Sequence, residues 1–88
     1  MFDWKVYILR CSDNSLYTGI TRDLNRRVDE HNNNDRLASA YTRARRPVTL
    51  AYEESHKDRS SASKREAVIK KMTKTEKEKL IKEKHGKK

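Results

Sequence analysis

The stretch that decides the fold of this chain is Val6–His31, VYILRCSDNSLYTGITRDLNRRVDEH. Within it, Val6–Leu9 and Leu16–Ile20 are rich in aromatic, aliphatic and β-branched residues, which is typical of strands. The four residues Ser12–Ser15 between them all favour turns. A polar segment with helical spacing follows from Asp23. The stretch therefore predicts a β-hairpin that leads into a helix.

Tyrosines lie on both strands of this hairpin. Tyr7 and Leu9 share one face of the first strand, and Tyr17 and Gly19 share a face of the second. A loop of three or five unpaired residues would align the two tyrosines, whereas a loop of four would oppose them. The sequence leaves this register open. Gly19 inside a strand indicates a bulge or a close approach by another group.

The helix after the hairpin has an unusual inward face. Thr21 or Asp23 is expected to cap it, and it should run to about Asn33. One face carries four residues at helical spacing: Leu24, Arg27, Val28 and His31. Two apolar residues are expected there, but an arginine and a histidine are not. Either Arg27 reaches out from the edge of the apolar stripe and His31 is a hydrogen-bonded helix-end residue, or both serve a functional site.

Four further elements are expected along the rest of the chain. They are a short helix over 36–42 around Leu37, Ala40 and Tyr41, a strand over 48–52, a helix over 58–72 and a last helix over about 75–84. The helix over 58–72 has its apolar positions at Ala62, Val68, Ile69 and Met72. A capping box at residues 75–78 is expected to open the last helix. The element order is therefore β-β-α-α-β-α-α.

Glu66 lies among the apolar positions of the helix over 58–72, because it is four residues after Ala62 and three before Ile69. Its carboxylate is therefore expected to point inward. Residues 63–66 also match a capping box, which would make Glu66 a helix-start residue instead. Asp58 is a good cap upstream of this box and favours the earlier start.

The chain is strongly basic, with 22 Lys and Arg against 13 Asp and Glu and a net charge of +9. Residues 63–88 hold 11 Lys and Arg against 4 acids, whereas residues 1–62 hold 11 against 9. Such an excess favours a polyanionic partner, although a merely solubilising surface has the same composition. The residues expected to contact a nucleic-acid backbone are Arg43, Arg45 and Arg46 in the connector before Pro47, and Lys70 and Lys71. A solvated loop is the alternative for the connector.

The cysteine count and the hydropathy pattern indicate the cellular compartment in which the protein is expected. The single cysteine, Cys11, allows no internal disulfide and indicates a reducing compartment. No apolar run is long enough to span a membrane, and no signal-peptide pattern is present. We therefore expect a cytoplasmic, monomeric protein without a membrane partner. One domain is expected over 1–88, with a core over 4–72 and a basic helix and tail over 73–88.

A family resemblance rests on residues Val6-Tyr7, Tyr17-Thr18-Gly19, Arg27, His31 and Glu66. In this order and spacing they resemble the GIY-YIG nuclease superfamily, and most of all its small stand-alone bacterial-type members. The resemblance covers Lys5 to about Met72 and implies an α+β fold with a three-stranded antiparallel sheet flanked by helices. Two features depart from the family pattern. Lys5-Val6-Tyr7 stands where the family has Gly-Ile-Tyr, and no asparagine follows Asn34, whereas many members have one after the glutamate.

The resemblance also implies a site, in which one cleft would gather the side chains of Tyr7, Tyr17, Arg27, His31 and Glu66. Glu66 would hold a single divalent cation, Mg²⁺ or Mn²⁺, and Arg27 would bind the scissile phosphate. Tyr7 or Tyr17 would orient or deprotonate the attacking water, unless a cation-bound water supplies the nucleophile. His31 would accept the proton.

The activity implied by the resemblance is metal-dependent hydrolysis of phosphodiester bonds in DNA, by an endonuclease that depends on DNA structure or reads sequence weakly. RNA is an alternative substrate. A non-catalytic nucleic-acid-binding module on the same scaffold is the main alternative function. A small protein whose basic surface meets an acidic protein is the third.

Overall fold

Three strands and four helices make up the described part of the chain. The computed structural model describes residues 4–86, and the side chains of residues 4–84. The elements are β1 (Trp4–Arg10), β2 (Leu16–Thr21), α1 (Leu24–Asn33), α2 (Ala40–Arg43), β3 (Thr49–His56), α3 (Arg59–Lys70) and α4 (Lys74–Gly86). The predicted order is confirmed. None of the helices in this range is long and apolar enough to cross a membrane.

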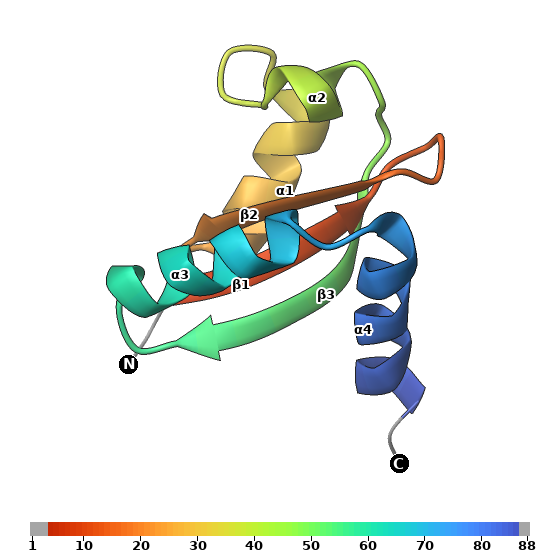
Figure 1. The fold of residues 1–88 in the computed structure, drawn as a ribbon. Coiled ribbons are helices and arrows are strands. Elements are labelled where there is room, and N and C mark those ends of the chain that lie inside the picture. The colour runs from red at the N-terminus through yellow and green to blue at the C-terminus, as the bar shows by residue number, and fades with distance from the viewer. Residues whose placement is uncertain (1–3, 87–88) are drawn as a thin grey trace.

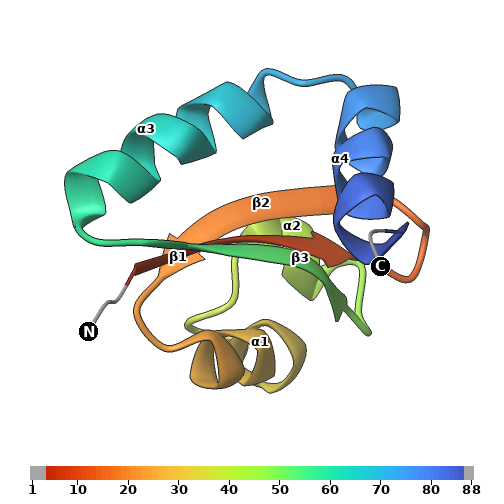
Figure 2. The ribbon, with the colours of Figure 1, turned by 90° about the horizontal axis from the view of Figure 1, so that it is seen from below.

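The strands form one antiparallel sheet in the order β2-β1-β3 (Figure 1). β1 is therefore the central strand, and the four residues Val6–Leu9 are at most 1% exposed. Helices cover both faces of the sheet, with α1 on one side and α3 on the other (Figure 2). The predicted α+β fold, a three-stranded antiparallel sheet flanked by helices, is confirmed.

Alternation along β1 divides the core into two clusters. The α3-side cluster consists of Val6, Ile8, Tyr52, Ala62, Ile69 and Ile81. The α1-side cluster consists of Tyr7, Leu9, Cys11 and Val48, against which Leu24, Val28, Tyr17 and Tyr41 pack. Each face of the central strand thus has its own set of apolar partners. Of the polar groups described below, Arg27 and His31 lie on the α1 side, and Glu66 belongs to α3.

The hairpin of β1 and β2 aligns the two tyrosines. Its loop leaves five residues, 11–15, unpaired between the strands, and Tyr7 lies opposite Gly19. Of the two registers that the sequence leaves open, the structure therefore has the one that puts Tyr7, Tyr17 and Gly19 on the same face.

α2 is shorter than the helix predicted over 36–42 and begins later. Ser39 is its N-cap and accepts a hydrogen bond from the backbone N–H of Thr42 at 3.1 Å, which sets the start at the next residue. Upstream, the side chain of Asn34 accepts hydrogen bonds from two backbone N–H groups and forms a turn. Leu37 lies in this turn and is 53% exposed, so its predicted packing in a helix is wrong.

β3 is longer than the strand predicted over 48–52, because it continues through two acidic residues to His56. The carboxylate of Glu54 accepts hydrogen bonds from Tyr52 at 2.5 Å and from Arg65 of α3 at 3.0 Å. His56 Nε2 lies 2.6 Å from the same carboxylate. These partners allow the strand to pass through an acidic segment that by composition favours a strand end.

α3 begins where the sequence places its favoured cap. The side chain of Asp58 accepts a hydrogen bond from the backbone N–H of Ser61 at 2.8 Å, so the alternative start at residue 63 is wrong. Ala62 and Ile69 are fully buried as predicted, but Val68 is 52% exposed. Glu66 therefore lies within the helix and is not a capping residue.

α4 begins with a capping box that lies two residues before the predicted one. Thr73 Oγ1 accepts from the N–H of Glu76 at 3.1 Å, and Glu76 Oε1 accepts from the N–H of Thr73 at 2.8 Å. The helix is then tied to the sheet by Arg10, whose two terminal nitrogens donate to the Glu78 carboxylate at 2.7 Å each. Ile81 packs in the α3-side cluster.

Candidate active site

α1 brings Arg27 and His31 against the tyrosines of the hairpin. Asp23 caps the helix, and its side chain accepts from a backbone N–H of the first turn at 3.1 Å. From this start, Leu24 and Val28 pack on the α1-side cluster, and His31 is fully buried. The predicted inward face of the helix is confirmed.

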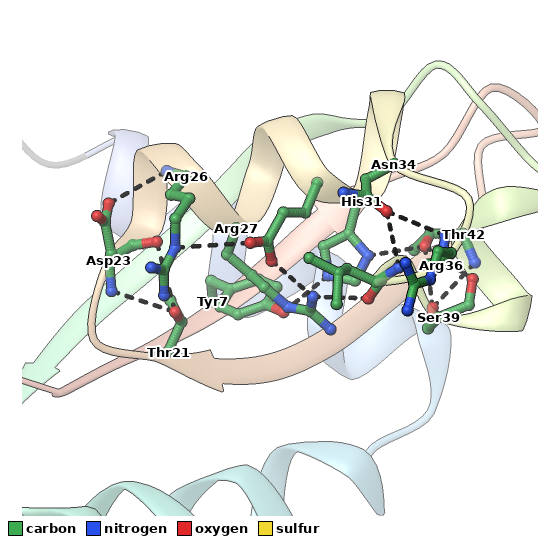
Figure 3. A network of polar contacts seen from close by, with 12 residues as sticks. Tyr7, Thr21, Asp23, Arg26, Arg27, His31, Asn34, Arg36, Ser39 and Thr42 are labelled. Carbon is green, nitrogen blue, oxygen red and sulfur yellow. Dashed lines mark hydrogen bonds and ion pairs between the residues drawn. The ribbon is translucent and has the colours of Figure 1, made fainter.

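A chain of hydrogen bonds runs from the Tyr7 hydroxyl through His31 to α2 (Figure 3). Tyr7 Oη lies 3.0 Å from His31 Nε2, and His31 Nδ1 lies 2.7 Å from Thr42 Oγ1. Thr42 Oγ1 donates to the carbonyl oxygen of Ser39 at 3.2 Å. Thr42 Oγ1 also lies 2.9 Å from Ser39 Oγ. In the tautomer with the proton on Nδ1, His31 donates to Thr42. His31 Nε2 is then the acceptor of the Tyr7 hydroxyl proton.

Arg27 forms one wall of the same site. Its Nη1 donates to Glu30 Oε1 at 2.9 Å and to the carbonyl oxygen of Leu37 at 2.8 Å. The guanidinium also lies near the Tyr7 hydroxyl, and its positive charge favours the ionised form of that hydroxyl. The side chain keeps 26% exposure, so part of its five-donor fork faces solvent. Arg27 is thus positioned by protein acceptors and still open to an anion.

Tyr17 continues the site as part of a row of rings. Its ring centroid lies 5.3 Å from that of His31, edge-on, and 5.9 Å from that of Tyr41, on which it stacks. The guanidinium carbon of Arg45 lies 3.9 Å from the centre of the Tyr41 ring. α2 and the connector that follows it therefore add an aromatic ring and a cation beside Tyr17.

The protonation states of Tyr7 and His31 follow from their burial. Burial raises the pKa of the Tyr7 hydroxyl to about 12, although the nearby positive charge of Arg27 acts in the opposite direction. Burial also lowers the pKa of His31 to about 4; the positive charge of Arg27 adds to this shift, and the charge of Glu30 opposes it. Both groups are therefore neutral at pH 7, with the proton on the tyrosine and the lone pair on the imidazole.

Glu66 approaches the site from α3. Its negative charge is one of the influences that raise the pKa of Tyr7, so the carboxylate lies close enough to act on that hydroxyl. The side chain is 21% exposed and forms an ion pair with Lys70 at 3.3 Å. Lys71, which follows α3 and is also predicted to contact a nucleic-acid backbone, is exposed. Direct contacts thus join Tyr7, His31 and Tyr17, and Arg27 lies beside the Tyr7 hydroxyl. The charge of Glu66 acts on that same hydroxyl.

A divalent cation at Glu66 would have this carboxylate as its main protein ligand. The described residues contain no group of three or more His, Cys, Asp or Glu side chains that could hold an ion together. Mg²⁺ commonly keeps several waters and is bound through one or two carboxylates. The partly exposed Glu66 carboxylate fits such a hydrated ion, provided that the Lys70 ammonium moves away.

The arginines predicted to hold a nucleic-acid backbone are engaged within the protein. Arg45 pairs with Asp13 at 3.3 Å, and Arg46 pairs with Asp35 at 2.7 Å. Arg43 donates to the backbone carbonyl of Asp35 at 2.8 Å. These contacts brace the segment after α2, so the three arginines have a structural role that the sequence does not indicate.

Comparison with known proteins agrees with this geometry. The GIY-YIG catalytic domain matches residues 3–87, which is nearly the whole chain. The chain belongs to the GIY-YIG family. Membership implies a nuclease-type domain that interacts with nucleic acid, in a family whose nucleases generally use a divalent metal.

Small proteins are among the relatives of this GIY-YIG domain. A UPF0213 protein of Desulfotalea psychrophila is 53% identical over 79 residues, which cover 90% of this chain and 71% of the relative. A UPF0213 protein of Staphylococcus aureus is 50% identical over 78 residues, which cover 89% of this chain and 93% of the relative. The resemblance to small stand-alone members of the family is confirmed.

Two solution NMR structures share the fold of this GIY-YIG domain. The protein EF2693 from E. faecalis is 36% identical with a TM-score of 0.66, covering 100% of this chain and 92% of that one. The UPF0213 protein BH0048 from Bacillus halodurans is 34% identical with a TM-score of 0.57, covering 91% and 83%.

Four residues of this GIY-YIG site were not among those predicted: Glu30, Ser39, Tyr41 and Thr42. The serine three residues before a threonine is a capping signal that the sequence contains. The sequence does not indicate that the threonine also forms a hydrogen bond with His31. That contact depends on the turn after α1, which brings α2 against the histidine.

Gly19 is required by the close approach of Tyr7 to β2, as its position in a strand predicts. A Cβ atom at residue 19 would lie 2.5 Å from Tyr7 Oη and 2.7 Å from Tyr7 Cζ. We expect Gly19→Ala to lower the free energy of unfolding by about 1–3 kcal/mol in urea denaturation, because the buried ring has no space to move. In a Tyr7→Leu background the same substitution should lower the free energy of unfolding much less. An equal loss of stability in both backgrounds would contradict the close contact between residue 19 and the Tyr7 ring.

The stability of the domain should depend on pH through His31. Its pKa is lower in the folded state, about 4, than its ordinary value of 6.5, so between these pH values the unfolded chain binds the extra proton. We expect the free energy of unfolding to fall by up to about 3 kcal/mol as the pH drops from about 6.5 to about 4. Denaturation of His31→Gln, which lacks this titration, is the control. An identical pH dependence in the variant would contradict the shifted pKa.

Proposed function

We propose that this GIY-YIG domain is a divalent-metal-dependent endonuclease that hydrolyses phosphodiester bonds in DNA. The observation that supports the proposal best is the meeting of the Tyr7 hydroxyl with neutral His31 and with the Arg27 guanidinium. Hydrolysis of a phosphodiester needs a group that takes a proton from water and a group that stabilises negative charge on the phosphate. The first is supplied by the tyrosine and histidine, and the second by the arginine.

Tyr7 and His31 act as one base in this proposal. The attacking water gives a proton to Tyr7 Oη while Tyr7 gives its own proton to His31 Nε2, so the phenol is neutral before and after the step. This route avoids a free tyrosinate, which a pKa of about 12 makes rare at pH 7. The imidazolium that results still donates its Nδ1–H to Thr42, and the negative charge of Glu30 offsets part of the cost that burial and Arg27 impose on it.

Arg27 binds the scissile phosphate. Glu30 and Leu37 fix Nη1, and the exposed remainder of the guanidinium donates to the non-bridging oxygens. Glu66 holds the divalent cation, Mg²⁺ or Mn²⁺, which when bound neutralises charge that develops on the phosphate and the leaving oxygen. Tyr17, beside the His31 ring, orients the attacking water.

Incubation with labelled nucleic acids tests the proposal. Single-stranded, duplex and branched DNA and matching RNA are treated with the purified protein in Mg²⁺, Mn²⁺ or EDTA. We expect DNA cleavage only with a divalent cation. Binding without metal-dependent cleavage of any substrate would identify a non-catalytic nucleic-acid-binding module instead. DNA affinity that hardly changes with salt would favour an acidic protein as the partner.

Thr42 is proposed to position His31 for the proton transfer. We expect Thr42→Val to lower kcat at least about tenfold, because the buried Nδ1–H loses the acceptor that fixes the imidazole tautomer. The same change should lower the free energy of unfolding by about 1–3 kcal/mol. Thr42→Ser keeps the hydroxyl and should restore most of kcat. A Ser variant as slow as the Val variant would show that the hydroxyl is not what matters.

A further inference from the structure

Trp4, Arg22 and Arg59 meet at one end of the sheet, away from the polar chain of the proposed site. Trp4 begins β1, Arg22 follows β2, and Arg59 is the first residue of α3. The guanidinium carbons of Arg22 and Arg59 lie 5.9 and 5.6 Å from the centre of the indole ring. The indole is partly exposed, and both arginines are exposed. Three elements distant in sequence thus contribute one aromatic ring and two cations.

The two arginines differ from most others in the protein. Within the part of the chain that the structure describes, six arginines form ion pairs with carboxylates: Arg10, Arg26, Arg27, Arg45, Arg46 and Arg65. Among the described residues, neither Arg22 nor Arg59 has such a partner. Their guanidinium groups lie within cation–π distance of the ring, a contact that does not use their N–H donors. No acceptor within residues 4–84 holds these donors, so they can bind the phosphates of a strand.

The position of Arg59 relative to Glu66 indicates the path of a bound nucleic-acid strand. Arg59 and Glu66 are seven residues apart, two turns of α3, so they lie on the same side of the helix. At 1.5 Å per residue they are separated by about 10 Å along the axis. A stacked nucleic-acid strand advances about 3.4 Å per nucleotide. A strand that passes Glu66 would therefore reach Trp4 about three nucleotides from the phosphate at the proposed site.

We propose that Trp4, Arg22 and Arg59 form a subsite for a single-stranded segment of the nucleic-acid substrate. A flat, partly exposed ring with flanking guanidinium groups offers a stacking surface to a base and donors to its phosphates. In a duplex the base faces are already stacked on one another, so only an unpaired base can use the ring. This inference rests on the proposed function and narrows its substrate class to strands with an unpaired segment about three nucleotides from the scissile bond.

The fluorescence of Trp4 tests the proposal directly, because it is the only tryptophan in the chain. The wild-type protein is titrated in EDTA with an oligothymidylate and with a duplex of equal length. We expect saturable quenching by the single strand and little by the duplex. Unchanged emission at a single-strand concentration that saturates binding in an anisotropy assay would overturn the proposal, as would failure of the single strand to bind.

A charge-matched pair of variants tests the arginines. Arg22→Gln with Arg59→Gln should weaken single-strand binding about tenfold and reduce its salt slope by about 1.4, with a smaller effect on duplex binding. Lys79→Gln with Lys82→Gln removes the same charge from exposed positions of α4 and should affect both ligands alike. Equal losses for both ligands in the arginine variant would contradict the subsite.

A parallel cleavage assay in Mg²⁺ separates this proposal from the one on which it rests. If the wild type cleaves no substrate, the proposed function fails. If the wild type cleaves but the arginine variant cleaves substrates with unpaired segments equally well, the subsite alone fails.

Discussion

Glu66→Gln is expected to slow metal-dependent cleavage by about 10³-fold, since loss of the carboxylate removes the proposed anchor of the cation. Glutamine keeps the size of the side chain, and the residue lies on the partly exposed side of α3, so the fold should be retained. DNA affinity in EDTA should stay the same or rise slightly, because a negative charge is lost near the proposed phosphate position. The rate of product formation with Mg²⁺ or Mn²⁺ and the affinity in EDTA are both measured.

Glu83→Gln is the control for this variant. Glu83 is exposed on α4, and its substitution makes the same change of charge away from the site. It should leave the cleavage rate within about twofold of wild type, as surface substitutions usually have small effects. A Glu66→Gln protein that keeps wild-type activity would contradict the assignment of the cation to this carboxylate.

Tyr7→Phe is expected to lower kcat by about 10²–10⁴-fold, because it removes the hydroxyl that relays the proton from water to His31. The ring remains, so the α1-side cluster keeps its packing. The loss of one buried hydrogen bond should cost about 1 kcal/mol of stability. Substrate affinity should change little, so KM should stay near the wild-type value while kcat falls.

Tyr52→Phe is a matched control for the tyrosine variant. Tyr52 is also a buried tyrosine of the sheet with a hydrogen-bonded hydroxyl, but it packs in the α3-side cluster and donates to Glu54. Its variant should lose some stability and keep its cleavage rate. If the two variants lose activity to the same extent, the effect of Tyr7→Phe is one of folding and not of proton transfer.

The hairpin and the helix after it could be predicted because their signals are local. Alternation of side chains on β1 decides which residues face each layer, and Asp23 sets the phase of α1, so that Arg27 and His31 face the sheet. Gly19 indicated a close approach, but only the hairpin register could identify Tyr7 as the group that approaches. That register depends on the turn, and the sequence allowed two.

The parts that could not be predicted depend on tertiary contacts. α2 starts at Ala40 because Ser39 caps it, and the turn before it exposes Leu37. Thr42 enters the site because this turn brings α2 back against His31. Similarly, the ion pairs of Arg45 with Asp13 and of Arg46 with Asp35 join residues that are distant in sequence, so only the folded chain shows them. Charge along a sequence does not reveal which charges are neutralised by neighbours.

The most direct measurement of the central claim is paramagnetic broadening of NMR signals by Mn²⁺. The claim is that side chains from the hairpin, α1 and α3 converge on one cation held by Glu66. Titration with Mn²⁺ should broaden the signals of Glu66, of the Tyr7 and Tyr17 rings and of the Arg27 side chain together, and Glu66→Gln should abolish this effect. Broadening confined to other acidic residues, or unchanged in the variant, would contradict the account.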